Sequence, residues 1–248
     1  VFPEGDDEAI KLWKRQARDI HIINQADRSK RLQLAKVLFL ADKFVDHCMY
    51  FPLQLDWRGR SYCLPNYLHY QGTDFSKGLI NFYEGKEIKS EDHVHWLGIH
   101  TANCWGLDKK PFKERLDWVF SNRDLFQAIH RDPLENNQWT NADKPWQFLA
   151  SCLELAEFFE NGYGTRTRVP VAQDASNQGL QLYSIMLHDE QGCYATNVLP
   201  SDSPKDLYQL VANRCIERLK ASDDPMARTW LEFGVDRKVT KRPTMCVS

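Results

Sequence analysis

The densest positive charge in this 248-residue sequence lies in the stretch GVDRKVTKRPTMCVS, positions 234–248. If this stretch is helical, Arg237 and Lys241 are four positions apart and share one face, and no carboxylate four positions away neutralises it. A guanidinium offers a planar fork of donors and an ammonium a compact charge, and both suit phosphate oxygens. The pattern indicates a site for a polyanion, and the alternative is a solvated basic face. Four cations fall within six residues: Arg237, Lys238, Lys241 and Arg242.

The carboxylate of Asp174, in RTRVPVAQDAS at positions 166–176, is the second group that could do chemistry. Val169 and Val171 alternate with other residues, which predicts a strand that ends at Asp174 and is followed by a turn and a helix. A carboxylate at a strand end is rigidly aimed and open to solvent. It suits Mg²⁺, which takes one or two protein carboxylates and completes its shell with water and phosphate oxygens. The alternative is an Asp that initiates a turn or caps a helix.

The stretch DWRGRSY at positions 56–62 combines cations with aromatic rings. Gly59, between Arg58 and Arg60, allows the backbone to turn tightly. With Trp57 and Tyr62 as stacking surfaces, the two guanidiniums could clamp a nucleic-acid backbone. The alternative is a turn with exposed arginines. Two further cations stand next to turn residues and, taken singly, are typical of plain surface: Lys77 and Lys109.

Composition bounds the class of protein. The chain is 42% apolar and 12% aromatic with a formal net charge of −2, so it can bury a core and is not broadly basic. Residues 11–60 nevertheless hold eleven Lys and Arg against five Asp and Glu, a local footprint for a polyanion. Seven cysteines without a CxxC pair exclude the common zinc frameworks and fit reduced thiols. No HExxH, GxSxG, GxGxxG or GxxxxGK motif is present, so protease, hydrolase, dinucleotide and P-loop sites lack support.

The hydrophobic pattern predicts a mostly helical α+β protein with a small sheet. Helix is expected over residues 7–50, with a cap at Ser29, and over 91–160 with breaks near 106–111 and 132–133. Residues 51–74 predict short strands and turns, and residues from 203 onward are mainly helical. The most apolar stretch is interrupted by charges and the N-terminus lacks a signal-peptide pattern, so neither secretion nor a membrane span is expected.

Six collinear stretches resemble the bacteriophage-type single-subunit DNA-dependent RNA polymerases, which include mitochondrial and plastid enzymes. They are YFPLQLDWRGRSY, QGTDFSKGL, IHTANCWGLDKKPF, PLENNQW, VPVAQDASNQGLQ and GVDRKVTKRPTM. The resemblance runs from about Leu12 to Ser248. It implies a right-hand fold of palm, fingers and thumb, and DNA-templated RNA synthesis by nucleotidyl transfer. It also implies a full-length monomer that binds a DNA template and promoter, the RNA transcript and NTPs.

The resemblance implies an order of domains along the chain. Residues 1–46 would end the thumb, and residues 47–88 would form the first part of the palm, with DWRGR. Residues 89–164 would be a helical insertion in the palm. Residues 165–190 would be the palm strand and helix with the catalytic Asp, and residues 191–248 would begin the fingers.

The resemblance also assigns roles to matched residues. Asp174 and the carbonyl of Ala175 would be ligands in a two-magnesium site whose second carboxylate lies outside this chain. Arg237, Lys241 and Lys109 would meet the triphosphate, and Lys241 would donate a proton to the leaving pyrophosphate, which makes Asp174 and Lys241 the catalytic pair. The residues that would contact template or RNA are Arg58, Arg60, Tyr62 and Lys77.

The sequence departs from the family pattern at several positions, namely Asn177, Gln178, Leu182, Pro243, Thr244 and Cys246. Of these, Pro243 would kink a helix over 235–245. Because the chain starts without Met and a sugar-selecting Tyr would follow Ser248, we interpret it as a partial sequence. Because the second metal carboxylate lies outside it, we expect it to be inactive alone. The expected location is the host cytoplasm for a phage enzyme, or a mitochondrion or plastid for an organellar one.

Two other interpretations stay open. A family A DNA polymerase shares the strand with the Asp and the helix with Arg and Lys four apart, although DWRGR and QGTDFSKG are not its motifs. A non-catalytic nucleic-acid-binding module could use the same basic segments. A module of that kind would show no metal or nucleotide affinity that depends on Asp174.

Overall fold

The structure, a computed structural model, describes residues 7–173, 177–201 and 203–247. Its contacts divide the chain into two compact units. Unit 1 comprises the described residues up to Leu97 together with Arg123–Pro170, and unit 2 comprises Gly98–Asn122 together with the described residues from Val171 onward. The helix α3 (Glu91–Trp105) begins in the first unit and ends in the second.

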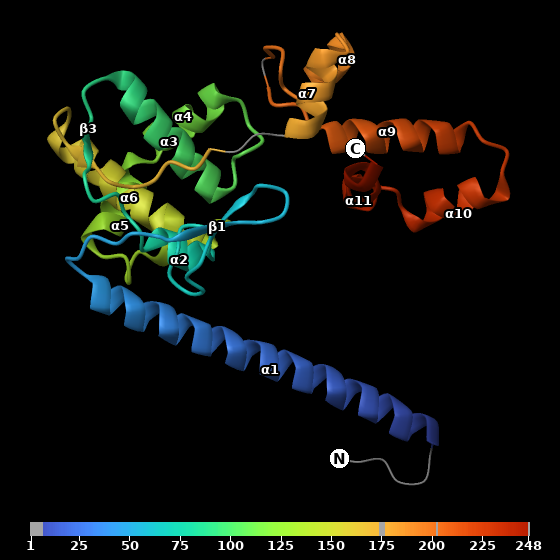
Figure 1. Ribbon diagram of the computed structural model, residues 1–248, viewed down its shortest axis with the longest axis horizontal. Coiled ribbons are helices and arrows are strands. Elements are labelled where there is room, and N and C mark those ends of the chain that lie inside the picture. The colour runs from blue at the N-terminus through green and yellow to red at the C-terminus, as the bar shows by residue number, and fades with distance from the viewer. Residues whose placement is uncertain (1–6, 174–176, 202, 248) are drawn as a thin grey trace. The chain divides into compact units, whose positions relative to one another are not determined.

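Unit 1 begins with the long helix α1 (Asp7–Phe44), drawn in blue in Figure 1. It contains neither Gly nor Pro, and its first turn carries Asp7 and Glu8 while its last turn carries Lys43, as the helix dipole favours. The cap predicted at Ser29 is wrong, because the helix continues through it. Val37, near the C-terminal end, is buried and packs in a small core with Leu68 and Ile80.

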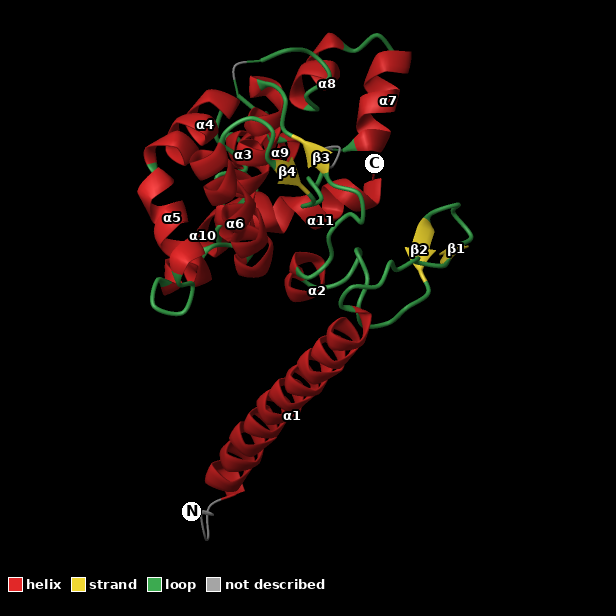
Figure 2. Cartoon of the chain, turned by 90° about the vertical axis from the view of Figure 1, so that its left-hand side faces the viewer, coloured by secondary structure: helices red, strands yellow, loops and turns green. Residues whose placement is uncertain are grey.

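A β-hairpin follows, made of β1 (Leu53–Leu55) and β2 (Ser61–Cys63). The strands are antiparallel, with Leu53 opposite Cys63 and Leu55 opposite Ser61. Figure 2 shows them in yellow. The predicted short strands and turns are confirmed, and the motif DWRGR forms the loop that joins the two strands.

The rest of unit 1 is a helical body around α6 (Pro145–Asn161). This helix packs on α2 (Asp74–Gly78) and on α5 (Arg123–Arg131), with the short helix η1 (Asn137–Asn141) beside it. Its core is fully buried and includes Phe126, Phe148, Cys152 and Leu155. The breaks predicted near residues 106–111 and 132–133 are confirmed, since α3 ends at Trp105 and α5 at Arg131.

The strand predicted to reach Asp174 is much shorter than expected. Only Arg166–Thr167 is strand, β4, and it pairs antiparallel with β3 (Lys86–Glu87). The reason lies in α6, where Glu154 accepts hydrogen bonds from the backbone N–H of Arg168 (2.8 Å) and Val169 (3.2 Å). Pro170 has no N–H, so none of the backbone N–H groups at positions 168–170 is available to extend the ladder with β3.

Unit 2 is helical in its described part. Its helices are α4 (Phe112–Ser121), α7 (Gln178–Met186), α8 (Glu190–Ala195), α9 (Leu207–Lys220), α10 (Pro225–Phe233) and α11 (Arg237–Val247). Helix α9 packs against both α10 and α11. The mostly helical α+β class is thus confirmed, with two small antiparallel sheets. Within the described residues, every helix is too short or too polar to cross a membrane.

Candidate active site

Helix α11 carries the basic motif and places two of its cations over one aromatic ring. Asp236 precedes the helix, and its Oδ1 accepts the backbone N–H of Lys238 (2.8 Å) and Val239 (2.9 Å), as an N-cap does. Arg237 and Lys241 lie one turn apart. The Cζ of Arg237 and the Nζ of Lys241 each lie 5.6 Å from the centroid of the Tyr208 ring on α9. The structure therefore brings these two predicted site residues together.

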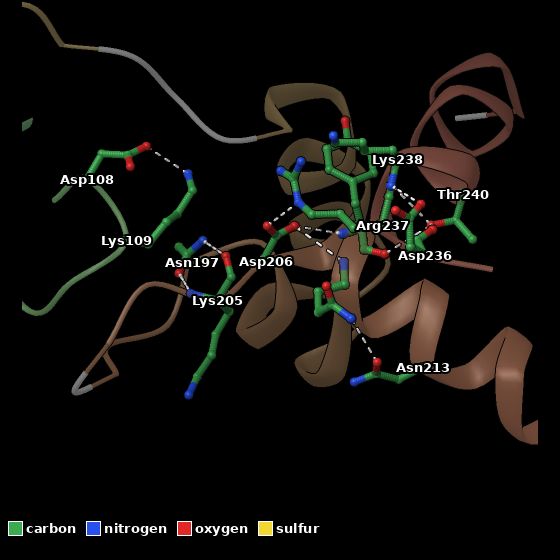
Figure 3. Close-up of polar contacts among 12 residues, drawn as sticks. Asp108, Lys109, Asn197, Lys205, Asp206, Asn213, Asp236, Arg237, Lys238 and Thr240 are labelled. Carbon is green, nitrogen blue, oxygen red and sulfur yellow. Dashed lines mark hydrogen bonds and ion pairs between the residues drawn. The ribbon is translucent and has the colours of Figure 1, made fainter. Parts of the chain in front are cut away.

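Arg237 is also paired with a carboxylate far away in the sequence. Its Nε donates to Oδ2 of Asp206 over 2.5 Å, and Figure 3 shows the two side chains pointing toward each other. Oδ1 of the same carboxylate accepts the backbone N–H of Tyr208 (3.1 Å) and Gln209 (3.3 Å), so Asp206 also caps α9. Burial alone would raise the pKa of Asp206, but Arg237 and the two N–H donors outweigh it and leave this pKa below its ordinary value.

Thr240 joins α11 to α9 next to this pair. It is buried, and its Oγ1 lies within hydrogen-bond distance of the carbonyl oxygens of Tyr208 (3.3 Å) and Asp236 (3.1 Å). One turn later, Pro243 removes a backbone donor from the helix. The hydroxyl of Thr244 donates to the carbonyl of Thr240 over 2.8 Å, and α11 continues to Val247. The predicted helix over this stretch is confirmed, with Pro243 inside it.

Lys109 lies in the loop between α3 and α4, and its ammonium pairs with Asp108 over 3.0 Å. The side chain of Arg115, which is only 4% exposed, holds this loop in place. Its guanidinium donates to the carbonyls of Lys110 (2.7 Å) and Asp108 (2.9 Å) and to Oδ1 of Asn103 (2.8 Å). Burial lowers the pKa of Arg115, and Asp108 offsets part of that shift. Lys109 and Arg237 are paired with different carboxylates, Asp108 and Asp206, so the described contacts do not bring Lys109 together with the cations of α11.

The DWRGR hairpin loop is ordered by one carboxylate. Oδ1 of Asp56 accepts the backbone N–H of both Arg58 and Arg60 at 2.8 Å, and Gly59 turns the chain at φ +80°. The guanidinium of Arg58 lies 4.4 Å from the centroid of the Trp57 ring, which is 86% exposed. Tyr62 is exposed on β2. Three predicted contact residues thus share one hairpin, and the tight turn expected at Gly59 is confirmed.

Lys77 lies in the last turn of α2, a helix that is anchored to α6. The carboxylate of Asp74 accepts the backbone N–H of Trp146 (2.9 Å) and Gln147 (3.3 Å) at the start of α6. A Cβ on Gly78 would lie 2.8 Å from the backbone of Trp146, so only glycine permits this close approach. Helix α2 therefore carries Lys77 on a fixed support.

Asp174 and Ala175, the predicted metal ligands, lie outside the described residues. On the N-terminal side, the backbone N–H of Ala172 donates to Nδ1 of the buried His100 over 3.3 Å. On the C-terminal side, α7 begins after Asn177, whose φ is +57°. In the described part of the chain, no group of three or more His, Cys, Asp or Glu side chains could hold a metal ion.

Sequence reasoning missed the residues that hold the cations in place, above all Asp206, Tyr208 and Arg115. An Asp directly before the apolar stretch LYQLV is an N-cap signal, so the capping role of Asp206 could have been found. Its pairing with Arg237, 31 positions away, leaves no local signal. Arg115 occupies an ordinary helical stretch, PFKERLDWV, and nothing in its sequence neighbours indicates burial.

Comparisons with known proteins identify relatives over nearly the whole chain. A family model described as DNA-dependent RNA polymerase matches residues 87–248. T7 RNA polymerase of Escherichia phage T7 is 36% identical over 97% of this chain and 30% of its own length. The DNA-directed RNA polymerase of Enterobacteria phage T3 is 36% identical over 99% of this chain and 31% of its own length.

A mitochondrial enzyme is similar as well. The mitochondrial DNA-directed RNA polymerase of Neurospora crassa is 34% identical over 97% of this chain and 17% of its own length. The chain spans about 30% of the length of the phage relatives that it matches. The family match covers well over half of the chain and includes both the loop with Lys109 and the helix α11. The chain therefore belongs to the family of DNA-dependent RNA polymerases.

Proposed function

We propose that this chain supplies the nucleotide-binding part of a DNA-directed RNA polymerase, which joins NTPs to a growing RNA on a DNA template. The observation that carries the proposal is the pair of cations on α11, Arg237 and Lys241, both 5.6 Å from the Tyr208 ring. Arg237 and Lys241 bind the triphosphate, and Lys109 adds a further contact from its loop. Positive groups at these points would stabilise the charge that develops on the transferred phosphorus and on the departing pyrophosphate.

In this proposal Lys241 has a second role, as the proton donor to pyrophosphate. A lysine ammonium can donate a proton to a phosphate oxygen as charge develops there. Arg58, Arg60, Tyr62 and Lys77 bind the template or RNA backbone. This assignment is supported by the hydrogen bonds of Asp56, which order the hairpin loop, and of Asp74, which anchor the helix that carries Lys77.

Asp174 and the carbonyl of Ala175 are proposed as magnesium ligands. A carboxylate and a backbone carbonyl are hard oxygen donors, so the chemistry of this donor set fits Mg²⁺. When bound, the two ions of such a site lower the pKa of the RNA 3′-hydroxyl and neutralise phosphate charge. The described neighbours of this segment are Ala172, whose backbone N–H donates to His100, and α7, which begins after Asn177.

The proposal extends to the domain order and the cellular location. Residues 1–46 belong to the thumb, 47–88 and 165–190 to the palm, 89–164 to an insertion in the palm, and 191–248 to the fingers. The location follows the origin of the chain, the host cytoplasm for a phage or the organelle for a mitochondrial or plastid enzyme. Because the relatives named above are all RNA polymerases, they support this function over that of a DNA polymerase.

Nucleotide binding by the 248-residue chain tests the proposal. We expect Arg237→Ala and Lys241→Ala each to weaken binding of Mg·ATP by about tenfold, since each removes one charge-assisted phosphate contact. Lys220→Ala, an exposed cation at the end of α9, serves as the matched control and should bind as the unmodified chain does. Asp174→Asn should remove the magnesium dependence of binding. Unchanged affinity in both α11 variants would overturn the proposal, and nucleic-acid binding without any nucleotide affinity would favour the non-catalytic module.

A further inference from the structure

The cation that is proposed to bind the triphosphate already has a protein partner. Arg237 and Asp206 form an ion pair with 36% and 27% of their side chains exposed, so it is half-buried rather than a loose surface contact. The 2.5 Å distance between Nε and Oδ2 is short even for a charge-assisted hydrogen bond. A pair of this kind fixes the direction of a side chain that otherwise has many rotamers.

The geometry of the pair decides which donors of Arg237 are engaged. Asp206 accepts from Nε, on the side of the guanidinium. The two terminal nitrogens, Nη1 and Nη2, carry the other four N–H groups, which form the fork that matches a phosphate. The centroid of the Tyr208 ring lies 5.6 Å from the guanidinium carbon, so the ring restricts rotation of the guanidinium on that side. Asp206 thus engages Arg237 without using its terminal fork.

The charge of Asp206 raises the question of whether it would repel the nucleotide. Its other oxygen, Oδ1, accepts two backbone N–H groups at the start of α9, where the helix carries a partial positive charge. That charge and the guanidinium together offset the carboxylate. The depressed pKa of Asp206 agrees, because it means that the surroundings stabilise the ionised form. Orientation of Arg237 should therefore outweigh the residual repulsion.

We infer that Asp206 is a positioning residue for nucleotide binding, which holds Arg237 through Nε so that its terminal nitrogens face the phosphates. The inference rests on the proposed role of Arg237 in binding the triphosphate. Asp206 does not itself touch the nucleotide. It sets the affinity by removing alternative orientations of Arg237 before the ligand arrives.

Two substitutions separate this role from the capping of α9. Asp206→Asn keeps the size of the side chain and caps a helix as well as Asp does, but it lacks the charge that binds Arg237. Asp206→Ala removes both functions. We expect Asp206→Asn to weaken Mg·ATP binding to the 248-residue chain about fivefold, with intact protection of the α9 amides from hydrogen exchange. The loss should be much smaller for AMP, which lacks the terminal phosphates.

A double-mutant cycle provides the decisive measurement. In the Arg237→Ala background, Asp206→Asn should no longer weaken Mg·ATP binding, because the residue that it positions is gone, and removal of an uncompensated negative charge can only tighten binding. An equal loss in both backgrounds would show that Asp206 acts only through the structure of α9 and would overturn the inference. Tighter Mg·ATP binding by Asp206→Asn would also overturn it, since Asp206 would then compete with the phosphates.

The cycle also distinguishes a failed inference from a failed function. If Arg237→Ala binds Mg·ATP normally, the proposed role of Arg237 is wrong and the inference falls with it. If Arg237→Ala binds weakly while Asp206→Asn binds normally, the proposed function stands and the positioning role of Asp206 is wrong.

Discussion

The β1–β2 hairpin and the α9–α11 pair use an Asp beside arginines in opposite ways. In the hairpin, the carboxylate of Asp56 binds the backbone N–H of Arg58 and Arg60 and leaves both guanidiniums to other partners. Between α9 and α11, the carboxylate of Asp206 binds the guanidinium of Arg237 directly. The first arrangement fixes the loop but not its side chains, and the second fixes the side chain itself.

This difference matches the shapes of the ligands that we propose for the two regions. A nucleic-acid backbone offers phosphates at many positions, so arginines on a fixed loop can adjust to it. A single triphosphate in an active site must be held in one geometry, since small displacements of the reacting atoms lower the rate steeply. The comparison therefore predicts adaptable cations at the hairpin and a preset cation on α11.

The largest expected effect is the loss of nucleic-acid affinity when the hairpin cations are removed. Arg58→Ala with Arg60→Ala should lower the affinity for an RNA–DNA hybrid, and the negative slope of log affinity against log salt should become shallower by about 1.5. The matched variant with both positions changed to Lys should keep the slope, because the two charges remain. Fluorescence anisotropy across a salt series measures both quantities. A slope that does not change in the Ala variant would remove the hairpin from the nucleic-acid interface.

The next effect concerns Asp56 and its control of the loop backbone. Asp56→Ala should destabilise the loop by about 1–2 kcal/mol, because two backbone N–H groups lose their acceptor. Asp56→Asn retains an acceptor oxygen and should lose less. Amide hydrogen exchange at Arg58 and Arg60 reports the change locally. Equal exchange in all three proteins would mean that the strands alone hold the loop.

Two glycines offer a matched pair of backbone tests, one in each region. Gly59 in the hairpin has φ +80° and Gly234 before α11 has φ +88°, and a Cβ at either would meet nothing within 4 Å. Ala at either position should therefore cost about 1 kcal/mol through strain alone. Exchange of the neighbouring amides measures this cost in each region. A much larger cost at one of the two sites would show that packing, and not only backbone strain, restricts that position.

The smallest expected effect is the pH dependence of the Asp206 pair. The pKa of Asp206 is lower in the folded chain than in the unfolded one, so its stabilisation is present at neutral pH. That stabilisation is lost as the pH falls below about 4 toward the lowered pKa, and for a half-exposed pair it is about 0.5 kcal/mol. The stability difference between the chain and Asp206→Asn, from amide exchange in α9 corrected for pH, should shrink on acidification. A constant difference would show that the cap matters and the charge does not.

Much of the fold was predictable because helical periodicity and turn residues act locally. The breaks near 106–111 and 132–133 coincide with glycine and proline, which end helices for steric reasons. The strand toward Asp174 was overestimated because Val169 and Val171 resemble a strand locally. Its limit depends on Glu154, which lies in another element and takes the backbone donors.

The candidate site was likewise predictable only where its features are determined by local sequence. The shared face of Arg237 and Lys241 follows from a spacing of four, and the tight turn at Gly59 follows from its residue type. The partners of these residues were not predictable, because Asp206, Tyr208 and Arg115 act through contacts between elements. A local pattern indicates which residues can bind a phosphate, whereas the tertiary structure decides which of them are held in place.

The guanidinium of Arg115 has a consequence for how this sequence can evolve. It spans three acceptors, at positions 103, 108 and 110, so an insertion or deletion in the loop would displace at least one of them. Natural variants should therefore keep the length of this loop while its solvent-facing side chains drift. Replacement of Arg115 should be accompanied by a compensating change at Asn103.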